Sequence, residues 1–402
     1  MAARTLTQYL LDLGRKTNGH DYAHVLSAVA ISMKLIAATV SRGPLITPEA
    51  IDGRGFDAVA VNEHLRRLAA SILVEQASGV HQLAAISIEG EPDIHPIASG
   101  PQARYLLAVE AMHGLLKLTE NQAVGVSFSI MERDPCGRSN AAVDSARDGD
   151  DVGTESVRPK PTGENVEEEG AVVAEDSAGS HEELRNAFLQ PGRGQVCAGM
   201  ALFGPSTVLV LTTGDGVDGF TLDRDVGNFV LTHPGLRVPE ASTIVAINPS
   251  GSLRWPAPVK RYVDECLQGR QGPRGDDFIM RWNASAVMGA FRVLMNGGIF
   301  IIPDEGRANP ACGLGDASEG VAFSHTGAPL ALLIEQAGGC AINGAERMLD
   351  LAPDSLSQRT PIIFGACEEV GRLKRYFVEH EKGYDTELLH PLFHDRSLFF
   401  RG

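Results

Sequence analysis

The feature that most constrains the fold is the alternation of short apolar runs with longer segments of helical periodicity. Runs such as 83–88, 125–131 and 196–203 are bounded by glycine or polar residues, a pattern typical of buried strands. In residues 21–41, by contrast, apolar side chains recur three and four positions apart, which predicts an amphipathic helix. Strands that alternate with helices along the chain predict an α/β or layered α+β fold.

The expected elements follow from these two periodicities and from local turn signals. We expect helices from Thr5 towards Lys16 and at 21–41, 57–77, 257–267, 284–296, 329–337 and 366–380, and strands at 83–88, 104–109, 125–131, 196–203, 207–213, 219–222, 243–248, 299–303 and 360–365. Thr5 and Gln8 have the spacing of a capping box. Gly214-Asp215-Gly216 is followed by a strand rather than a helix, so it predicts a hairpin turn and not a phosphate loop. The apolar stripe of 21–41 is expected to face the core or a subunit interface.

Residues 134–183 interrupt the alternation. The segment contains no Phe, Tyr, Trp, Ile or Leu, and between Asp144 and Glu183 thirteen acidic residues stand against three basic ones. Such a composition cannot bury enough apolar surface to offset the entropy of ordering the chain. We therefore expect a disordered acidic surface insertion here, and a solvated loop rather than a functional acidic arm.

Charge and cysteine usage restrict the partners and the compartment. A formal net charge of −16 disfavours nucleic acid and anionic membranes as partners. No run of 18 apolar residues is present, so no membrane span is expected. The six cysteines form no Cys-x-x-Cys pair, which argues against a zinc site and against a disulfide scaffold, and which favours a cytoplasmic location.

Five short blocks follow one another along the chain. They are Thr5-Leu6-Thr7 with Gly14-Arg15-Lys16; Gln190-Pro191-Gly192-Arg193 with Ala198-Gly199, Gly204, Gly216-Val217 and Leu222-Asp223; Arg281 with Ser285; Gly297-Gly298-Ile299-Phe300 with Pro303; and Glu335, Gly338-Gly339, Leu349-Asp350 and Gln358-Arg359. In this order the blocks resemble the class I fructose-1,6-bisphosphatases. Each block alone is a weak signal, and their succession is specific to that family rather than to the related inositol phosphatases.

The resemblance implies a two-domain α-β-α-β-α sandwich that usually assembles as a tetramer. It places an N-terminal, regulatory-type α/β domain at 1–236, with the insertion inside it, and a C-terminal, substrate-type α/β domain at 237–402. The family reaction is hydrolysis of the 1-phosphate of fructose 1,6-bisphosphate. Divalent cations, usually Mg²⁺, activate the attacking water in that reaction, and they require several carboxylate ligands.

The metal-ligand positions depart from the family pattern. The family motif Asp-Pro-Leu-Asp-Gly-Ser-Ser corresponds to 110–116, where Glu110 replaces the first aspartate and His113 the second. Glu89 keeps its carboxylate, whereas Ile88 and Thr326 stand where the family has glutamates. Glu63 matches a further carboxylate. We therefore name Glu89, Glu110 and His113 as relic catalytic positions and as the candidate metal ligands. Zn²⁺ or Mn²⁺ would suit them better than Mg²⁺, because a neutral imidazole is a poor Mg²⁺ ligand.

At the substrate-binding positions of the family, some residues of this chain match and others do not. The resemblance makes Asn248, Arg281, Trp282 and Ser285 the candidate substrate-binding residues, and Arg281 matches an arginine that reaches the pocket of a neighbouring subunit. The lysine that bridges sugar and phosphate in the family aligns with Gly320. Arg104-Tyr105 resembles part of the AMP site, but the threonine-rich turn of that site is replaced near His20-Asp21.

Two functions remain open from the sequence. The first is a homologue with a degraded metal site and little or no Mg²⁺-dependent activity, which acts as a sugar-phosphate sensor or as a partner subunit of an active paralogue. The alternative is an active phosphatase of carbohydrate metabolism with a changed metal or substrate. No cofactor is assigned with certainty. A homo-oligomer or hetero-oligomer is expected, because the stripe of 21–41 and Arg281 both fit an interface.

Overall fold

The computed structural model describes residues 4–16, 22–46, 57–114, 118, 120–133, 181–240, 242–305 and 320–384. The predicted insertion falls outside the described residues as far as position 180. Residues 181–183 are described, and they form the start of a helix that runs to 187. This helix therefore includes the last three residues of the predicted insertion.

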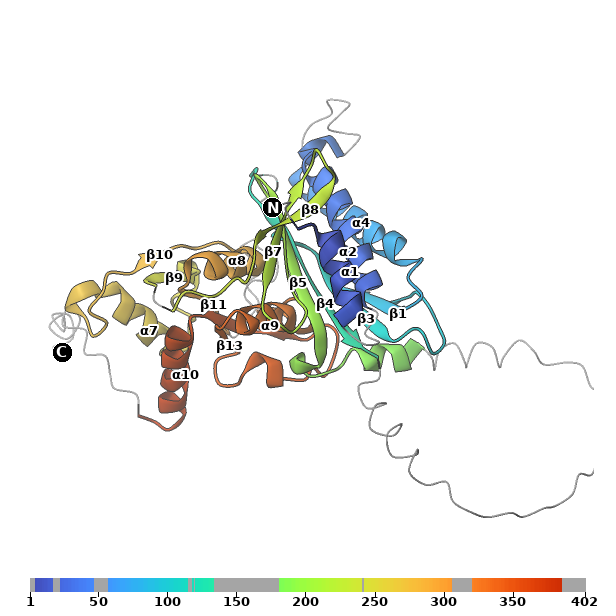
Figure 1. Cartoon of the computed structure of the whole chain (residues 1–402). Helices are drawn as coiled ribbons and strands as arrows, with labels where there is room; N and C mark the ends of the chain where they lie inside the picture. The colour runs from blue at the N-terminus through green and yellow to red at the C-terminus, as the bar shows by residue number, and fades with distance from the viewer. Residues whose placement is uncertain are drawn as a thin grey trace, which may run out of the picture.

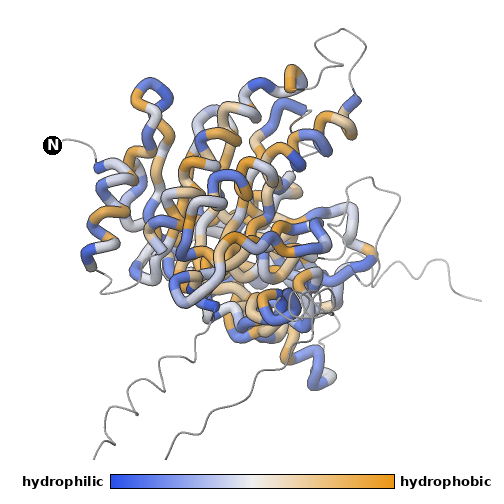
Figure 2. The backbone as a smooth tube through the Cα atoms, turned by 90° about the vertical axis from the view of Figure 1, so that its right-hand side faces the viewer, coloured by the Kyte–Doolittle hydropathy of each residue, from blue (hydrophilic) through white to orange (hydrophobic). Residues whose placement is uncertain are grey.

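Five layers build the molecule, as Figure 1 shows. Helices α1, α2 and α4 cover one face of an eight-stranded sheet, and α8 and α9 lie between this sheet and a five-stranded one. Helices α7 and α10 cover the far face of the second sheet. This is the α-β-α-β-α sandwich expected from the sequence, and hydrophobic segments run through its interior (Figure 2).

The eight-stranded sheet has the order β2-β1-β3-β4-β5-β6-β7-β8. Its strands are β1 (Leu83–Ile88), β2 (His95–Pro96), β3 (Tyr105–His113), β4 (Val124–Glu132), β5 (Gln195–Phe203), β6 (Thr207–Thr212), β7 (Asp218–Asp223) and β8 (Asn228–His233). β1 and β3 are parallel, and every other neighbouring pair is antiparallel. β6 and β7 are antiparallel neighbours joined through Gly214-Asp215-Gly216, so the prediction of a hairpin turn there is confirmed.

The five-stranded sheet has the order β10-β9-β11-β15-β13. Its strands are β9 (Ile244–Ile247), β10 (Ile279–Met280), β11 (Ile299–Ile302), β13 (Cys340–Ile342) and β15 (Ile362–Gly365), while β12 (Val321–Ala322) and β14 (Arg359–Thr360) form a separate pair. All of its strands come from residues 244–365, and those of the first sheet come from 83–233. The domain boundary at 236/237 is still a prediction.

The labelled helices are α1 (Leu6–Lys16), α2 (Ala23–Val40), α4 (Ala58–Ala77), α7 (Ala257–Leu267), α8 (Ala286–Asn296), α9 (Ala328–Gln336) and α10 (Cys367–Glu381). A side chain caps the first turn of three of them, α1, α4 and α8. At α1 the Thr5 N–H donates to Gln8 Oε1 at 3.0 Å, and the Gln8 N–H donates to Thr5 Oγ1 at 3.3 Å, which confirms the capping box. Asp57 caps α4 through two backbone amides.

Strand β5 illustrates why the first sheet needs helices on both faces. Cys197, Ala201 and Phe203 face the core formed with α1, α2 and α4, whereas Ala198, Met200 and Leu202 face the core shared with α8 and α9. Side chains alternate between the faces of a strand, so a run that is apolar throughout is buried on both sides. The second core also contains residues of the five-stranded sheet, such as Phe300 and Phe364, and it joins the two sheets.

The apolar stripe of α2 faces the core of the same chain. Five of its six members are buried in the core below the first sheet, and Val40 is half-buried: Tyr22, Leu26, Val29, Met33, Ile36 and Val40. α2 is the one described helix that is long and apolar enough to cross a membrane, and half of its 18-residue window is buried inside the structure. Of the two places expected for the stripe, core or subunit interface, the structure shows the core, because α4 and the sheet cover it.

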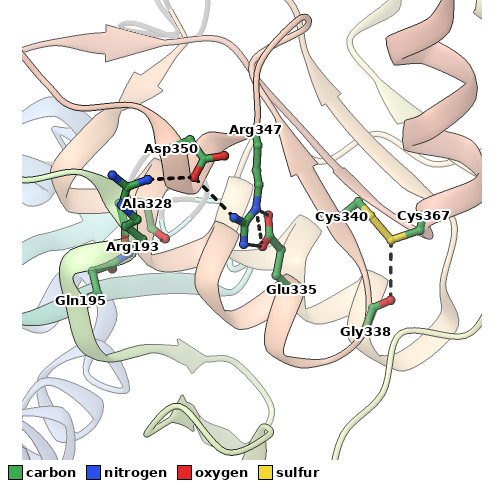
Figure 3. Close-up of polar contacts among 10 residues, drawn as sticks. Arg193, Gln195, Ala328, Glu335, Gly338, Cys340, Arg347, Asp350 and Cys367 are labelled. Atoms are coloured by element: carbon green, nitrogen blue, oxygen red, sulfur yellow. Dashed lines mark hydrogen bonds and ion pairs between the residues drawn. A yellow bond between two sulfur atoms is a disulfide. The ribbon is translucent and has the colours of Figure 1, made fainter.

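The sequence argued against a disulfide scaffold, and the described residues contain a single disulfide. Cys340, at the start of β13, is bonded to Cys367, at the start of α10, with a Cα–Cα distance of 4.9 Å (Figure 3). The two residues meet because Cys340 pairs with Gly365 across the β13–β15 ladder. Cys197 and Cys266 are free and buried. The cytoplasmic location is still a prediction, and in that compartment the thiol pool would tend to reduce the bond.

The disulfide closes a segment that is held to the rest of the molecule by ion pairs. Arg347 donates to Glu335 on α9 at 2.6 Å and to Asp350 at 3.4 Å, and Arg193 lies 3.5 Å from Asp350 (Figure 3). Gly192 also donates its N–H to the carbonyl of Leu351. The closed segment is thus anchored both to α9 and to the residues before β5.

Breaking this disulfide is expected to destabilise the protein. The two cysteines are 27 residues apart. A cross-link that closes a loop of that size stabilises a fold by about 3 kcal/mol, because it lowers the conformational entropy of the unfolded chain. Urea denaturation of the oxidised protein and of the Cys340→Ser/Cys367→Ser variant should show this difference. A dithiol reductant should reproduce the loss in the parent protein and have no effect on the variant. Equal stability of the oxidised and reduced forms would contradict the prediction.

Candidate functional site

The candidate site lies where β1 and β3 end, beside the turn that precedes α9. β1 and β3 are parallel, so their carboxyl ends meet at one edge of the sheet, where ligands bind in α/β folds. β3 is longer than predicted, since it continues through Glu110 to His113 with a register shift between them. Glu89 follows β1 directly. The five residues of η8 (Phe323–Gly327) form a π-helical turn beside these strand ends, and all five are buried.

Glu110 is held from two sides by residues of the same chain. The hydroxyl of Thr326 donates a short hydrogen bond to Glu110 Oε2, and His113 Nε2 lies 3.7 Å from Glu110 Oε1. The side chains of Glu110 and His113 are only 16% and 13% exposed. The structure thus brings Glu110 and His113 together, and nothing in the sequence indicated that the Thr326 hydroxyl would hydrogen-bond to one of the Glu110 oxygens.

A second set of neutral groups lies behind this pair. Ser127 on β4 donates to the carbonyl of His325 at 2.8 Å and to Thr326 Oγ1 at 3.3 Å. His325 Nε2 and Ser87 Oγ lie 2.8 Å apart, and both residues are buried. Complete burial lowers the pKa of His325 to about 4, so its imidazole is neutral at pH 7. His325 is thus not a plain loop histidine, because η8 carries this side chain into the core.

The Ser87–His325 pair has the residue types of a nucleophile and its base. Ser87 is 4% and His325 is 2% exposed, so a substrate cannot reach them in this arrangement. The pair therefore cross-links β1 to η8, and we assign it no chemistry.

Glu89 faces a cation. Arg359 Nη1 donates to Glu89 Oε1 at 3.2 Å, and Arg359 Nη2 donates to the carbonyl of Gly320 at 3.1 Å. Gly320 has a φ of +87°, and a Cβ at this position would collide with the carbonyl oxygen of Thr360. The backbone here suits glycine alone, so position 320 cannot provide the lysine with which the family bridges sugar and phosphate.

These carboxylates do not converge as a metal site would require. Glu63 lies on α4 within ion-pair distance of Arg66 and Arg67, and Glu89 is paired with Arg359. Among the residues that the structure describes, no three His, Cys, Asp or Glu side chains come close enough to hold a metal ion together. Mg²⁺ binds through several hard oxygen ligands, so the described donor set does not fit it.

The candidate substrate residues lie on the segments that directly follow β9 and β10 and at the start of α8. Asn248 Oδ1 accepts from the N–H and the hydroxyl of Ser250, and Ser285 is the buried N-cap of α8. Trp282 stacks on Phe300 with ring centroids 5.9 Å apart. Ser285 thus has a structural role, and Asn248 uses its carbonyl oxygen within its own turn.

Positive charge is concentrated at Arg281. Arg281 is exposed, and Arg292 Nη1 donates to its backbone carbonyl at 2.7 Å. Burial, together with the charge of Arg281, lowers the pKa of Arg292. The Nε and Nη2 atoms of Arg292 are buried and have no hydrogen-bond partner among the described residues. Two neighbouring guanidinium groups form a local environment that favours an anion.

The comparisons with known proteins agree with this architecture. Residues 238–378 match the model of the fructose-1,6-bisphosphatase C-terminal domain, and residues 171–234 match that of the N-terminal domain. The two matched segments together make up half of the chain. The chain belongs to the fructose-1,6-bisphosphatase family.

Solved structures of Leishmania major fructose-1,6-bisphosphatase are similar over nearly the whole length. The holo form has 25% sequence identity and a TM-score of 0.71, and the match covers 93% of this chain and 99% of the other. The apo form gives 25% identity, a TM-score of 0.69 and the same coverage. The T-state form gives 24% identity and a TM-score of 0.70, with 94% and 99% covered. This member of the family therefore keeps the whole two-sheet fold.

The hydrogen bond to Glu110 provides a test of how the site is held. Thr326→Val keeps the shape of the side chain but leaves a nearly buried carboxylate without its donor, which should lower the free energy of unfolding by about 1–3 kcal/mol. Thr326→Ser keeps the hydroxyl and serves as the matched control, with a smaller loss. Urea denaturation of the three proteins measures both effects. A Val variant as stable as the parent would show that Thr326 does not hold Glu110.

Proposed function

We propose that this chain has lost the ordinary Mg²⁺-dependent hydrolysis of fructose 1,6-bisphosphate and binds a sugar phosphate instead, either as a sensor or as a partner subunit of an active paralogue. The observation that supports this most is the neutral hydrogen-bonded chain through Ser127 and Thr326 to Glu110. In this chain the two hydroxyls and the carboxylate are hydrogen-bonded to one another. The family reaction needs carboxylates at these strand ends that are open to cations. The neutral imidazole of His325 adds no ligand there, because it is buried against Ser87.

Sugar-phosphate binding is supported by the second sheet. Arg281 and Arg292 keep two guanidinium groups beside the stacked pair of Trp282 and Phe300. A planar guanidinium matches the oxygens of a phosphate, and a stacked indole offers an apolar surface to a sugar ring. Asn248 and Ser285, the other two candidates, act through the turn and the helix cap that shape this region.

The first test is phosphate release from fructose 1,6-bisphosphate in the presence of Mg²⁺, Mn²⁺ or Zn²⁺. With Mg²⁺ the rate should be at background, because Ile88, His113 and Thr326 offer no carboxylate. A turnover in the ordinary enzyme range, roughly 1–1000 per second, from protein free of any active paralogue would refute the proposal. Release only with Mn²⁺ or Zn²⁺ would favour the alternative, a phosphatase with changed metal preference.

A calorimetric titration of the same protein with fructose 6-phosphate tests the binding half of the proposal. Arg281→Gln should weaken binding at least tenfold, which is the order expected when a charged hydrogen bond to phosphate is removed. Arg15→Gln, on the exposed face of α1, is the matched control and should leave binding unchanged. Equal affinity in the two variants would rule out the Arg281 region as the binding site.

We also propose that copies of this chain, or this chain and a paralogue, meet at the edge of the five-stranded sheet. β10 is an edge strand, and its Ile279 and Met280 are 50% and 38% exposed directly before Arg281. An exposed apolar edge strand is a ready surface for pairing with another chain, and natural proteins normally cover it. This argument replaces the one from the apolar stripe of α2.

Light scattering after size-exclusion chromatography should therefore give a dimer or a tetramer. Met280→Glu places a charge on the proposed interface and should shift the protein towards the monomer. Leu11→Glu changes an exposed leucine of α1 and is the matched control, which should keep the parent mass. A parent protein that is a monomer at micromolar concentration, alone and with its paralogue, would contradict the interface.

A further inference from the structure

A cavity of about 610 Å³ lies at the open end of the eight-stranded sheet, on residues to which we have so far given no role. Its walls are the carboxyl end of α2 with η1 (Gly43–Ile46), residues 121–123 before β4, and the turn between β5 and β6. Phe203 and Val40 give it an apolar side, and Asn121 and Gln122 give it a polar one. Cavities of this size and mixed lining are typical of small-molecule sites.

The charge of the cavity is opposite to that of the protein. Arg42 and Arg224 both line it, and none of the described lining residues is acidic. The chain as a whole carries a net charge of −16, so this wall is a local exception. Arg42 uses one N–H for the carbonyl of Leu45 at 3.3 Å. The neighbouring carboxylate of Asp223 accepts from two amides of its own turn, at 3.0 and 3.1 Å.

A buried hydroxyl in the wall lacks a partner. Thr207 is 1% exposed, and its Oγ1 has no hydrogen-bond partner among the described residues, although it borders the cavity. Burying such a group without a partner costs free energy, so it marks a place where a ligand atom would be stabilised. Asn121, which also lines the cavity, has a φ of +58°. Asn tolerates this conformation in turns, and here its N–H donates to the carbonyl of Leu118.

We propose that this cavity binds a small, multiply charged oxyanion, either a phosphate monoester or a polycarboxylate. The two guanidinium groups provide the charge and the paired N–H donors that such oxygens match, and Thr207 provides a neutral donor. The proposal does not depend on the loss of hydrolysis or on binding at Arg281. Residues 121–123 lead directly into β4, whose Ser127 donates to Thr326 and to His325, so an occupied cavity is linked to the candidate site through one strand.

Calorimetric titration of the Arg281→Gln protein tests the cavity without the other proposed site. Inorganic phosphate and citrate are added in separate arms at fixed ionic strength, with sodium chloride as the reference, because screening alone changes with salt. Saturable binding of at least one anion is expected, and the tighter arm identifies the ligand class. Arg42→Gln/Arg224→Gln should weaken that binding at least tenfold, while Arg15→Gln should not change it. The absence of saturable binding to both anions, or equal affinity in the double variant, would overturn the proposal.

Thr207→Val gives an independent readout, because the two shapes are alike and only the hydroxyl is lost. Removing a buried hydroxyl that has no partner should raise the thermal midpoint of the ligand-free protein. The same change should weaken anion binding several-fold, since the ligand loses a donor. A variant with a lower midpoint, or with unchanged affinity, would show that Thr207 serves the fold rather than a ligand.

Discussion

Burial of the eight-stranded sheet on both faces is the constraint on which the rest of the structure depends. β1, β5 and β6 carry apolar side chains on both sides, and β4 is buried on both, so the sheet is stable only between two layers. One layer, α8 and α9, must then bury its own far side, and the five-stranded sheet covers it. The candidate site, the cavity and the edge strand β10 all lie at the ends or margins of these layers.

The interior of the candidate site follows from the same constraint. η8 is packed so closely against β3 and β4 that every side chain it carries is buried. Polar groups in such a place must find partners within the protein. Thr326 finds Glu110, and His325 finds Ser87. A carboxylate at position 326 would bring a second negative charge against Glu110 in a nearly dry environment, which is costly unless a cation lies between them. A threonine removes that need.

The sequence predicted the features that local pattern determines. The capping box at Thr5, the strands with apolar residues throughout, and the hairpin turn at 214–216 all depend on near neighbours. It missed β8, β10 and β13, which are short or partly exposed edge strands without a clear periodicity. It missed the disulfide because Cys340 and Cys367 meet only through the pairing of β13 with β15. It missed Thr326 as the partner of Glu110 because 216 positions separate them.

The core that contains Met200, Phe300 and Phe364 takes side chains from both sheets and from the helices between them. A cut at 236/237 would separate two lengths of chain but would divide this core, and each half would expose an apolar face of the size that normally drives association. The two halves are therefore expected to melt in a single calorimetric transition rather than in two. The molecule would then unfold as one cooperative unit. A chimera with a relative would keep this core only if both halves of the chain were taken from the same protein.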